Sequence, residues 1–188
     1  MKKILLTCFE PFGGEVINPS EEAVKNVSAP LGCDVMKLRL PVAWGKSQKT
    51  LFDAIDYFSP DVVLMTGQAG GSSAVRIERV AINLCGAIKD EDGLYPAGSE
   101  VATELPVMEG APTAYFATFD CKKIQNALKE ENIPAVLSYS AGTYICNYIM
   151  FSALDRFACE NRKAKAGSFT CLMRTVRKAG CRRWGSTL

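Results

Sequence analysis

Apolar residues recur along this chain at intervals that predict strands and helices in alternation. Short, almost continuously apolar runs are typical of buried strands, and longer segments with apolar residues three or four apart are typical of amphipathic helices. This alternation indicates an α/β fold: a three-layer α/β/α sandwich with a mostly parallel twisted sheet. We expect strands over residues 3–9, 34–42, 61–66, 78–85 and 133–138, and helices after residue 18 and over 46–58, 120–131 and 143–158.

Local signals mark where several of these segments begin and end. Gly13 and Gly14 follow the first strand and predict a turn. Asn18 then precedes Pro19 and two acidic residues, which is the pattern of an N-cap followed by the first turn of a helix. The segment 86–112 is expected to be mostly loop. In an α/β sheet, functional residues are expected on loops beyond the strand ends.

Length and composition fit one globular domain. A chain of 188 residues with 48% hydrophobic residues buries roughly 70% of the surface that it exposes when unfolded. No stretch approaches the roughly 18 apolar residues of a membrane span, and the first apolar run is too short for a secretory signal. We therefore expect a cytoplasmic protein that binds no membrane and keeps its eight cysteines reduced. They form no C-x-x-C pair, so no metal is expected.

Charge is distributed unevenly along the chain. Residues 161–188 carry eight basic and no acidic side chains, whereas residues 1–160 carry 14 basic and 20 acidic ones, a net charge of −6. A basic tail can bind nucleic acid. A segment translated out of frame would show the same abrupt change of composition. Both explanations stay open at this point.

Cys146 is the main candidate for chemistry. It follows the stretch S-Y-S-A-G-T-Y-I, in which an apolar strand passes through small residues into a helix. Unpaired N–H groups and the macrodipole at a helix N-terminus favour thiolate over thiol, as a cysteine nucleophile requires. The alternative is a small buried apolar residue, the role expected of the other seven cysteines. A cysteine nucleophile ordinarily needs a histidine base, and the chain contains no histidine.

Two glycine-containing segments could contribute to a site around this thiol. The segment G-Q-A-G-G, residues 67–71, follows the third strand, and its glycines either let the backbone approach a ligand or form a simple turn. It is not a phosphate-binding motif, so nucleotide binding is disfavoured. Phe9 and Phe12 either wall a small apolar pocket or anchor the loop that carries them.

Glu78 is the candidate acidic residue. Its carboxylate could orient a catalytic base, as the acid of a triad does. Because Arg76 and Arg79 flank it, the alternative is a solvated ion pair that contributes little to stability.

Three groups of residues together resemble the pyroglutamyl peptidase I family, cysteine peptidases that remove an N-terminal pyroglutamate. They are L-L-T-C-F-E-P-F-G-G-E-x-x-N-P-S near the start, G-Q-A-G-G with E-R-V-A-I-N in the middle, and S-x-S-A-G-T-Y-I-C-N followed by A-K-A-G. These groups occur in the family's order over residues 1 to about 167. The resemblance implies Cys146 as the nucleophile and Glu78 as the acidic member of a Cys-His-Glu triad.

The resemblance also implies a pocket for the flat, uncharged pyroglutamyl ring, with pyroglutamyl peptides as partners. An uncharged pocket would exclude a protonated amino terminus, because burying an unpaired ammonium is costly. Tyr144 stands where the family often has Phe. The family further implies a homo-oligomer, often a tetramer, and no cofactor. The implied pocket residues are Phe9, Phe12, Asn18, Gln68, Ile88, Tyr144 and Ile145.

The chain departs from the family where the catalytic histidine is expected. The family continues A-G-F-I-H-V-P-Y, whereas residues 166–173 here read A-G-S-F-T-C-L-M. Restoring one T after Gly167 converts TCA-TTC-ACG-TGC-CTT-ATG, a permitted coding of S-F-T-C-L-M, into TTC-ATT-CAC-GTG-CCT-TAT, which encodes F-I-H-V-P-Y. One lost base thus explains the missing histidine and the basic tail. The rival explanation is a genuine tail on a divergent, noncatalytic relative.

These observations predict a single domain, residues 1–188, in which 1–167 are family-like and 168–188 are out of frame. The predicted function is removal of N-terminal pyroglutamate by a cysteine-type peptidase whose histidine is missing here. The alternatives are an inactive relative that binds pyroglutamyl peptides, and a nucleic-acid binder acting through the tail. We also expect the family's last strand and helix to be lost, leaving an open sheet edge and poor solubility.

Overall fold

The computed structural model describes residues 1–68 and 70–171. Its main sheet has the strand order β2-β1-β3-β8-β4-β7. Neighbouring strands are parallel except β8 and β4, which are antiparallel. A small second sheet pairs β5 with β6. The strands are β1 (Lys2–Phe9), β2 (Cys33–Leu40), β3 (Val62–Gln68), β4 (Val75–Glu78), β5 (Val80–Ile82), β6 (Ala114–Phe116), β7 (Ala135–Ser138) and β8 (Lys165–Cys171).

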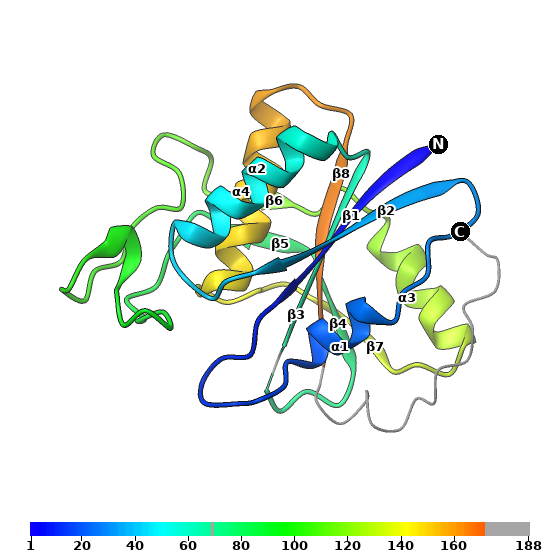
Figure 1. Cartoon of the computed structure of the whole chain (residues 1–188), viewed down its shortest axis with the longest axis horizontal. Coiled ribbons are helices and arrows are strands. Elements are labelled where there is room, and N and C mark those ends of the chain that lie inside the picture. The colour runs from blue at the N-terminus through cyan, green and yellow to red at the C-terminus, as the bar shows by residue number, and fades with distance from the viewer. Residues whose placement is uncertain (69, 172–188) are drawn as a thin grey trace.

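Helices cover both faces of the main sheet. α2 and α4 pack together on one face, and α1 and α3 lie on the other (Figure 1). The predicted three-layer sandwich with a mostly parallel sheet is therefore confirmed. The described α-helices are α1 (Pro19–Lys25), α2 (Lys46–Phe58), α3 (Cys121–Glu130) and α4 (Ile145–Cys159).

Side chains of β1 alternate between two cores. Leu5 and Phe9 join the large core beneath α2 and α4, whereas Leu6 and Cys8 pack with Val24 of α1. Successive side chains of a strand point to opposite faces, so the apolar run of β1 is buried on both sides. This strand thereby fixes the position of the loop that follows Phe9, at the carboxyl end of β1.

The sequence signals for helix starts are confirmed. Asn18 Oδ1 accepts a hydrogen bond from Ser20 N at 2.9 Å, with Pro19 as the first residue of α1. Asp120 caps α3 by accepting a hydrogen bond from Lys123 N at 3.0 Å. The limits of α2 coincide with the predicted range. Local polar side chains thus cap the starts of α1 and α3, whereas α2 begins after Gly45 without a side-chain cap.

The predicted strand over residues 78–85 is divided in the structure. Glu78 ends β4 in the main sheet, and β5 belongs to the small second sheet. Arg79 lies between them, where its N–H donates to Ser138 O and its carbonyl accepts from Ala117 N. The sequence of residues 78–85 contains no turn signal that would mark this change of strand partner. The short strand β6, with which β5 pairs, was not predicted.

β8 contradicts the expectation that the last strand is lost. It lies between β3 and β4 in the middle of the sheet, and its residues from Ser168 onward fall in the segment expected to be out of frame. Main-chain hydrogen bonds form the strand ladder whatever the side chains are. The side chains of β8 also alternate between the two faces of the sheet. Phe169 packs against Phe119 on one face, and Ser168 and Thr170 are buried on the other. The edges of the described sheet are β2 and β7.

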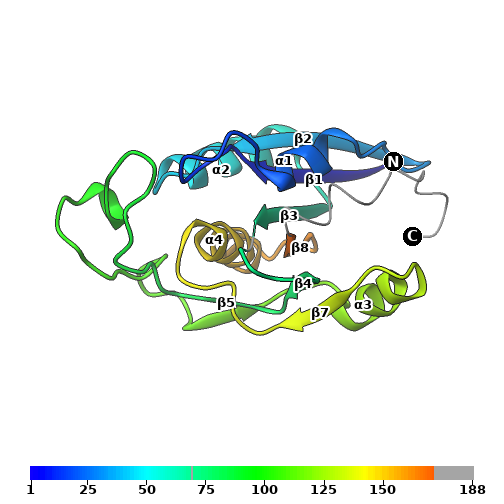
Figure 2. The same cartoon turned by 90° about the horizontal axis from the view of Figure 1, so that it is seen from below.

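Residues 83–113, which include the predicted loop 86–112, are mostly loop and project beyond the layered body (Figure 2). They contain one short 3₁₀ turn, η1 (Pro96–Gly98). The base of this loop is fixed to the start of α2. Asp90 Oδ2 accepts a hydrogen bond from Trp44 N at 2.8 Å, and Trp44 Nε1 donates to Ile88 O at 3.0 Å.

Two further expectations concern the chain as a whole. Within the described residues, no helix is long and apolar enough to cross a membrane. The cysteines up to residue 159 are free thiols. Cys8, Cys85 and Cys121 are buried as expected, whereas Cys159 is exposed and Cys33 is only partly buried.

Candidate active site

Cys146 lies one residue into α4, at the helix N-terminus that the sequence predicted. Its Sγ lies against Gly67, near the end of β3. A Cβ added to Gly67 would stand 2.9 Å from Cys146 Sγ, closer than a carbon and a sulfur atom tolerate. The glycine at this position therefore makes room for the thiol, while the predicted approach of this segment to a ligand stays a prediction.

Glu78 is a buried carboxylate at the end of β4, with 1% of its surface exposed. Its Oε1 accepts a hydrogen bond from Thr170 Oγ1 at 2.8 Å and lies 3.4 Å from Arg76 Nε. Its Oε2 is buried and has no hydrogen-bond partner among the described residues. The solvated ion pair considered for Glu78 is therefore wrong, because the carboxylate is shielded from water. A buried, incompletely paired carboxylate is costly and calls for a functional explanation.

Thr170 connects this carboxylate to the thiol. The strand register places Thr170 beside Gly67. Its Cγ2 lies 3.5 Å from the point where a Gly67 Cβ would stand, the same point that Cys146 Sγ approaches. The side chain of residue 170 thus touches Glu78 on one side and the neighbourhood of Cys146 on the other. Sequence reasoning did not single out Thr170, although it is the third residue after Gly167, where the restored reading F-I-H has its histidine.

The surroundings of Cys146 favour a protonated thiol. Burial, and to a lesser extent the Glu78 carboxylate, raises the pKa of the Cys146 thiol to about 12. The residue keeps some exposed surface, and burial of its sulfur is the larger of the two causes. The predicted position of Cys146 at a helix start is correct, whereas the raised pKa runs against the expectation that its thiolate is favoured. A cation beside the sulfur would reverse the balance.

Asn147 holds the start of α4 in place, and sequence reasoning missed it. This fully buried residue donates from Nδ2 to Ile82 O at 2.9 Å and to Leu84 O at 3.0 Å. Its Oδ1 accepts a hydrogen bond from Ile82 N at 2.9 Å. These bonds tie the residue after Cys146 to β5. The signal in the sequence was an amide among the mainly apolar residues at the start of the helix. A buried amide needs hydrogen-bond partners, and this need points to a structural role.

Four of the seven predicted pocket residues share an apolar cluster with the thiol. Phe9, Phe12, Tyr144 and Ile145 belong to the same apolar cluster as Cys146. Phe9 is almost fully buried, whereas Phe12 and Tyr144 are only partly buried. Ile145 is 1% exposed, so its side chain is a core residue of α4. The cluster gives the site an aromatic and aliphatic wall.

The remaining predicted pocket residues lie in different surroundings. Gln68 is the last residue of β3 and follows the glycine that faces the thiol. Asn18 is fully buried, and its Nδ2 donates to Glu10 O at 3.0 Å while its Oδ1 caps α1. Ile88 is 45% exposed, at the base of the projecting loop. The contacts of Asn18 are therefore internal to its own loop and helix.

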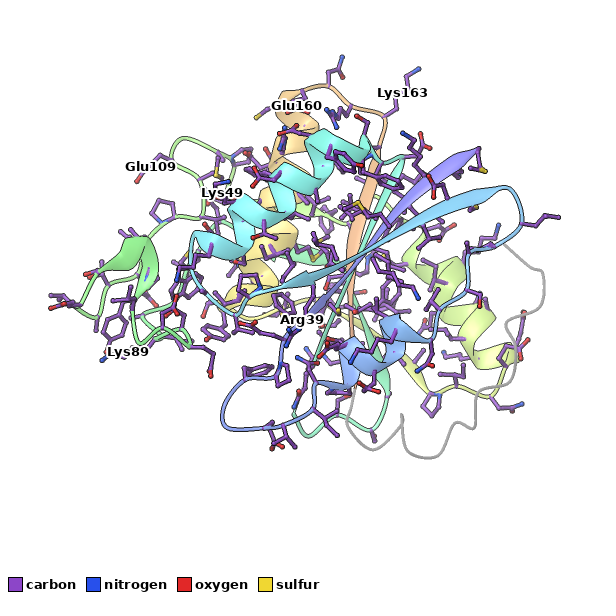
Figure 3. The ribbon with its side chains drawn as sticks, viewed as in Figure 1. Arg39, Lys49, Lys89, Glu109, Glu160 and Lys163 are labelled. Carbon is purple, nitrogen blue, oxygen red and sulfur yellow. The ribbon has the colours of Figure 1, made fainter. Side chains whose placement is uncertain are left out.

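Tyr144 joins the start of α4 to the projecting loop. Its hydroxyl donates to Lys89 O at 3.3 Å, and its ring makes an edge contact with Trp44 at a centroid distance of 5.5 Å. Figure 3 shows Lys89 on this loop. Burial raises the pKa of Tyr144 to about 12, so the hydroxyl keeps its proton and remains a donor. The departure from Phe at this position thus adds a contact to the loop.

Comparison with known proteins identifies this arrangement. The model of the pyroglutamyl peptidase family matches residues 2–172. The chain belongs to the pyroglutamyl peptidase family. It is 46% identical over 167 residues to the pyrrolidone-carboxylate peptidase of Thermococcus kodakarensis, covering 88% of this chain and 78% of that protein. Pyrrolidone-carboxylate peptidase 1 of Caldanaerobacter subterraneus is 42% identical over 167 residues, with coverage of 88% and 79%.

Solved structures of pyroglutamyl peptidases share the fold. Pyroglutamyl peptidase I of Bacillus amyloliquefaciens superposes with a TM-score of 0.82 at 36% identity, covering 92% of this chain and 82% of that one. Pyrrolidone carboxyl peptidase of Pyrococcus furiosus gives a TM-score of 0.84 at 38% identity, with coverage of 90% and 80%. The family is that of pyroglutamyl peptidase I, a cysteine exopeptidase. This chain contains no histidine.

Proposed function

We propose that this chain carries the site of a peptidase that removes N-terminal pyroglutamate, with the place of its general base at position 170 occupied by threonine. Cys146 is the nucleophile and Glu78 the acidic residue of the site. Family membership supports the reaction. The side chain of Thr170, between the thiol and the carboxylate, is the observation that carries the assignment of the base.

Two independent arguments meet at this residue. The restored reading frame puts a histidine at position 170 on the basis of codons alone. Thr170 Oγ1 donates to Glu78 Oε1 at 2.8 Å, and an imidazole N–H in its place would find the same acceptor. Protonated imidazole would supply the cation that the Cys146 thiol lacks. The frameshift within codon 168 and the out-of-frame tail, residues 168–188, are part of this proposal.

The proposed reaction is acyl transfer. In a chain with the histidine of the restored reading frame at position 170, the imidazole takes the proton of Cys146 Sγ, and the sulfur attacks the pyroglutamyl carbonyl carbon and forms a bond to it. The base then returns the proton to the leaving amine as the peptide bond breaks. Water, deprotonated by the same base, hydrolyses the thioester and frees Cys146. N–H groups of the first turn of α4 stabilise the oxyanion.

The apolar wall beside Cys146 suits the pyroglutamyl ring. Aromatic side chains such as Phe9 and Phe12 can enclose a flat, uncharged lactam, and polar groups near Gln68 can bind its N–H and C=O. Ile88, Tyr144 and Ile145 stay proposed pocket residues, as does Asn18 despite its internal contacts. A homo-oligomeric state and a cytoplasmic location complete the proposal. Light scattering of the purified chain tests the first.

Substitution at one position tests the proposed function. The Thr170→His variant should hydrolyse a pyroglutamyl aminomethylcoumarin amide at least about 100-fold faster than the unaltered chain, because a positioned base contributes about 10² to 10⁴ in rate. Cys146→Ala in the Thr170→His background is the control and should abolish the gain. Equal rates for the two position-170 variants, with both chains folded, would contradict the assignment of the base.

A second candidate function is binding of pyroglutamyl peptides without turnover. The raised pKa of the Cys146 thiol favours it, because the nucleophilic thiolate is then scarce near neutral pH. Stoichiometric binding of a pyroglutamyl peptide that is recovered intact after incubation would support this function for the chain as it stands. Resequencing of codons 165–172 decides whether the histidine is encoded.

A further inference from the structure

An open groove lies next to the candidate active site. Its volume is about 720 Å³, which is within the usual range for ligand sites. One wall is the loop between β3 and β4, and the other is β7 with the residues that follow it toward α4. The groove is lined by residues 70–74, Arg76 and residues 136–140.

Arg76 links this groove to the catalytic residues. Its Nε lies 3.4 Å from Glu78 Oε1, and its terminal nitrogen donates to Ser138 Oγ at 2.8 Å and to Ser140 O at 3.1 Å. Arg76 and Glu78 point to the same face of β4, because they are two residues apart. The groove is therefore lined by a side chain that directly contacts the carboxylate.

The described lining of the groove carries a positive charge, that of Arg76. Among the described residues that line it, Arg76 is the only charged one, and none is Asp or Glu. The side chain of Arg76 keeps 38% of its surface exposed, and its second terminal nitrogen has no hydrogen-bond partner among the described residues. Serine hydroxyls and main-chain groups make up most of the other polar lining. A carboxylate is the group that an exposed guanidinium binds best.

We propose that this groove binds the leaving peptide, the part of the substrate that follows pyroglutamate, and that Arg76 favours an acidic side chain within its first residues. This inference rests on the proposed function, because only a pyroglutamyl group beside Cys146 brings the rest of the peptide into the groove. It assigns Arg76 a role in specificity in addition to its contact with Glu78.

Peptide binding to the Cys146→Ser variant tests the inference without turnover. The probes are pyroglutamyl-Glu-Glu-amide, pyroglutamyl-Gln-Gln-amide and pyroglutamyl-Lys-Lys-amide, with prolyl-Glu-Glu-amide as the reference that lacks the lactam. The Glu-Glu peptide should bind about twofold to fivefold more tightly than the Gln-Gln peptide, the range of an exposed ion pair. The Lys-Lys peptide should bind most weakly. The differences should shrink in high salt, because exposed charges are screened.

Three variants separate the groove from general effects of charge. Ser73→Asp puts a carboxylate on the exposed loop wall away from Glu78 and should reverse the order of the Glu-Glu and Lys-Lys peptides. Ser73→Asn adds similar bulk without charge and should keep the order. Lys163→Gln removes a positive charge before the start of β8, far from the groove at the upper end of the molecule in Figure 3, and should also keep it.

The possible results distinguish this inference from the proposed function. If no pyroglutamyl peptide binds more tightly than the prolyl reference, the proposed function fails and the inference fails with it. If pyroglutamyl peptides bind selectively but the three side-chain pairs bind equally at low salt, the inference is overturned and the proposed function stands. An order that Ser73→Asp leaves unchanged would likewise overturn the inference.

Discussion

Thr170 donates its hydroxyl hydrogen bond to Glu78 and so holds a buried carboxylate in place without giving Cys146 a base. The carboxylate is buried, and burial of the sulfur together with this carboxylate raises the pKa of the Cys146 thiol. An imidazolium between them would stabilise both anions. At the scale of single residues, the site thus has two of the three groups that the proposed reaction needs.

Alkylation of Cys146 should depend on pH in a way that reports its raised pKa. Because the thiolate is the reactive form, the rate of reaction with iodoacetamide should keep rising up to about pH 12. Mass spectrometry of the Cys146 peptide measures this rate, with the exposed Cys159 as an internal check that the reagent is active. A plateau near pH 9 would show that the thiol is not shielded as described.

Gly67→Ala should inactivate the Thr170→His variant. Its new Cβ would stand 2.9 Å from Cys146 Sγ and must displace the sulfur. A displacement near 1 Å costs about 100-fold in rate, measured as kcat/KM on the pyroglutamyl amide. Ser28→Ala, at an exposed residue between α1 and β2, is the control and should leave the rate unchanged. Equal losses for the two substitutions would contradict the role given to Gly67.

At the scale of elements, the start of α4 is fixed by polar contacts. Asn147 ties its first turn to β5, and Tyr144 ties the preceding residue to the projecting loop. The nucleophile therefore lies between two anchored residues. Its position depends on contacts with segments about 60 residues earlier in the chain.

Asn147→Ala should destabilise the protein by about 3 kcal/mol, because it leaves buried main-chain groups of residues 82 and 84 without partners. Urea unfolding followed by circular dichroism measures the change. Asn126→Ala on the exposed surface of α3 is the matched control and should change stability by less than about 1 kcal/mol. Similar effects of both substitutions would show that the buried amide is not important.

Helices and strands with a clear local pattern of apolar residues were predictable from sequence. Strands that depend on a pairing partner far away in sequence were not. α2 has the predicted limits because its amphipathic pattern and the chain around it are local information. β6 and β8 were missed, because a short strand is stabilised by a neighbour far away in sequence. For the same reason Cys146 and Glu78 could be named from sequence, whereas their connection through Thr170 required the sheet register.

At the scale of the whole molecule, buried thiols make stability depend on alkaline pH. Burial raises the pKa of Cys8 to about 11 and the pKa of Cys85 and Cys146 to about 12, from 9.0. Above pH 9 the unfolded chain therefore releases protons that the folded chain retains. Stability is complete below about pH 9 and declines as the pH rises toward the folded pKa values.

The free energy of unfolding in urea should accordingly fall between pH 8.5 and pH 11, the window that these shifts define. Cys85→Ala removes one titrating group and should make the decline less steep, even if it lowers stability at pH 8.5. A free energy that is constant across this window would contradict the burial of the thiols. Refolding from pH 11 to pH 8.5 verifies that the transition is reversible.

The order of strands has a consequence for biosynthesis. β8 is the last strand of the described sheet to leave the ribosome, yet it alone joins β2-β1-β3 to β4-β7. Until residues 165–171 emerge, the nascent chain can form only two separate half-sheets. Each half exposes a strand edge that another chain could pair with. Shielding of these edges by a chaperone would therefore favour correct pairing until β8 is made.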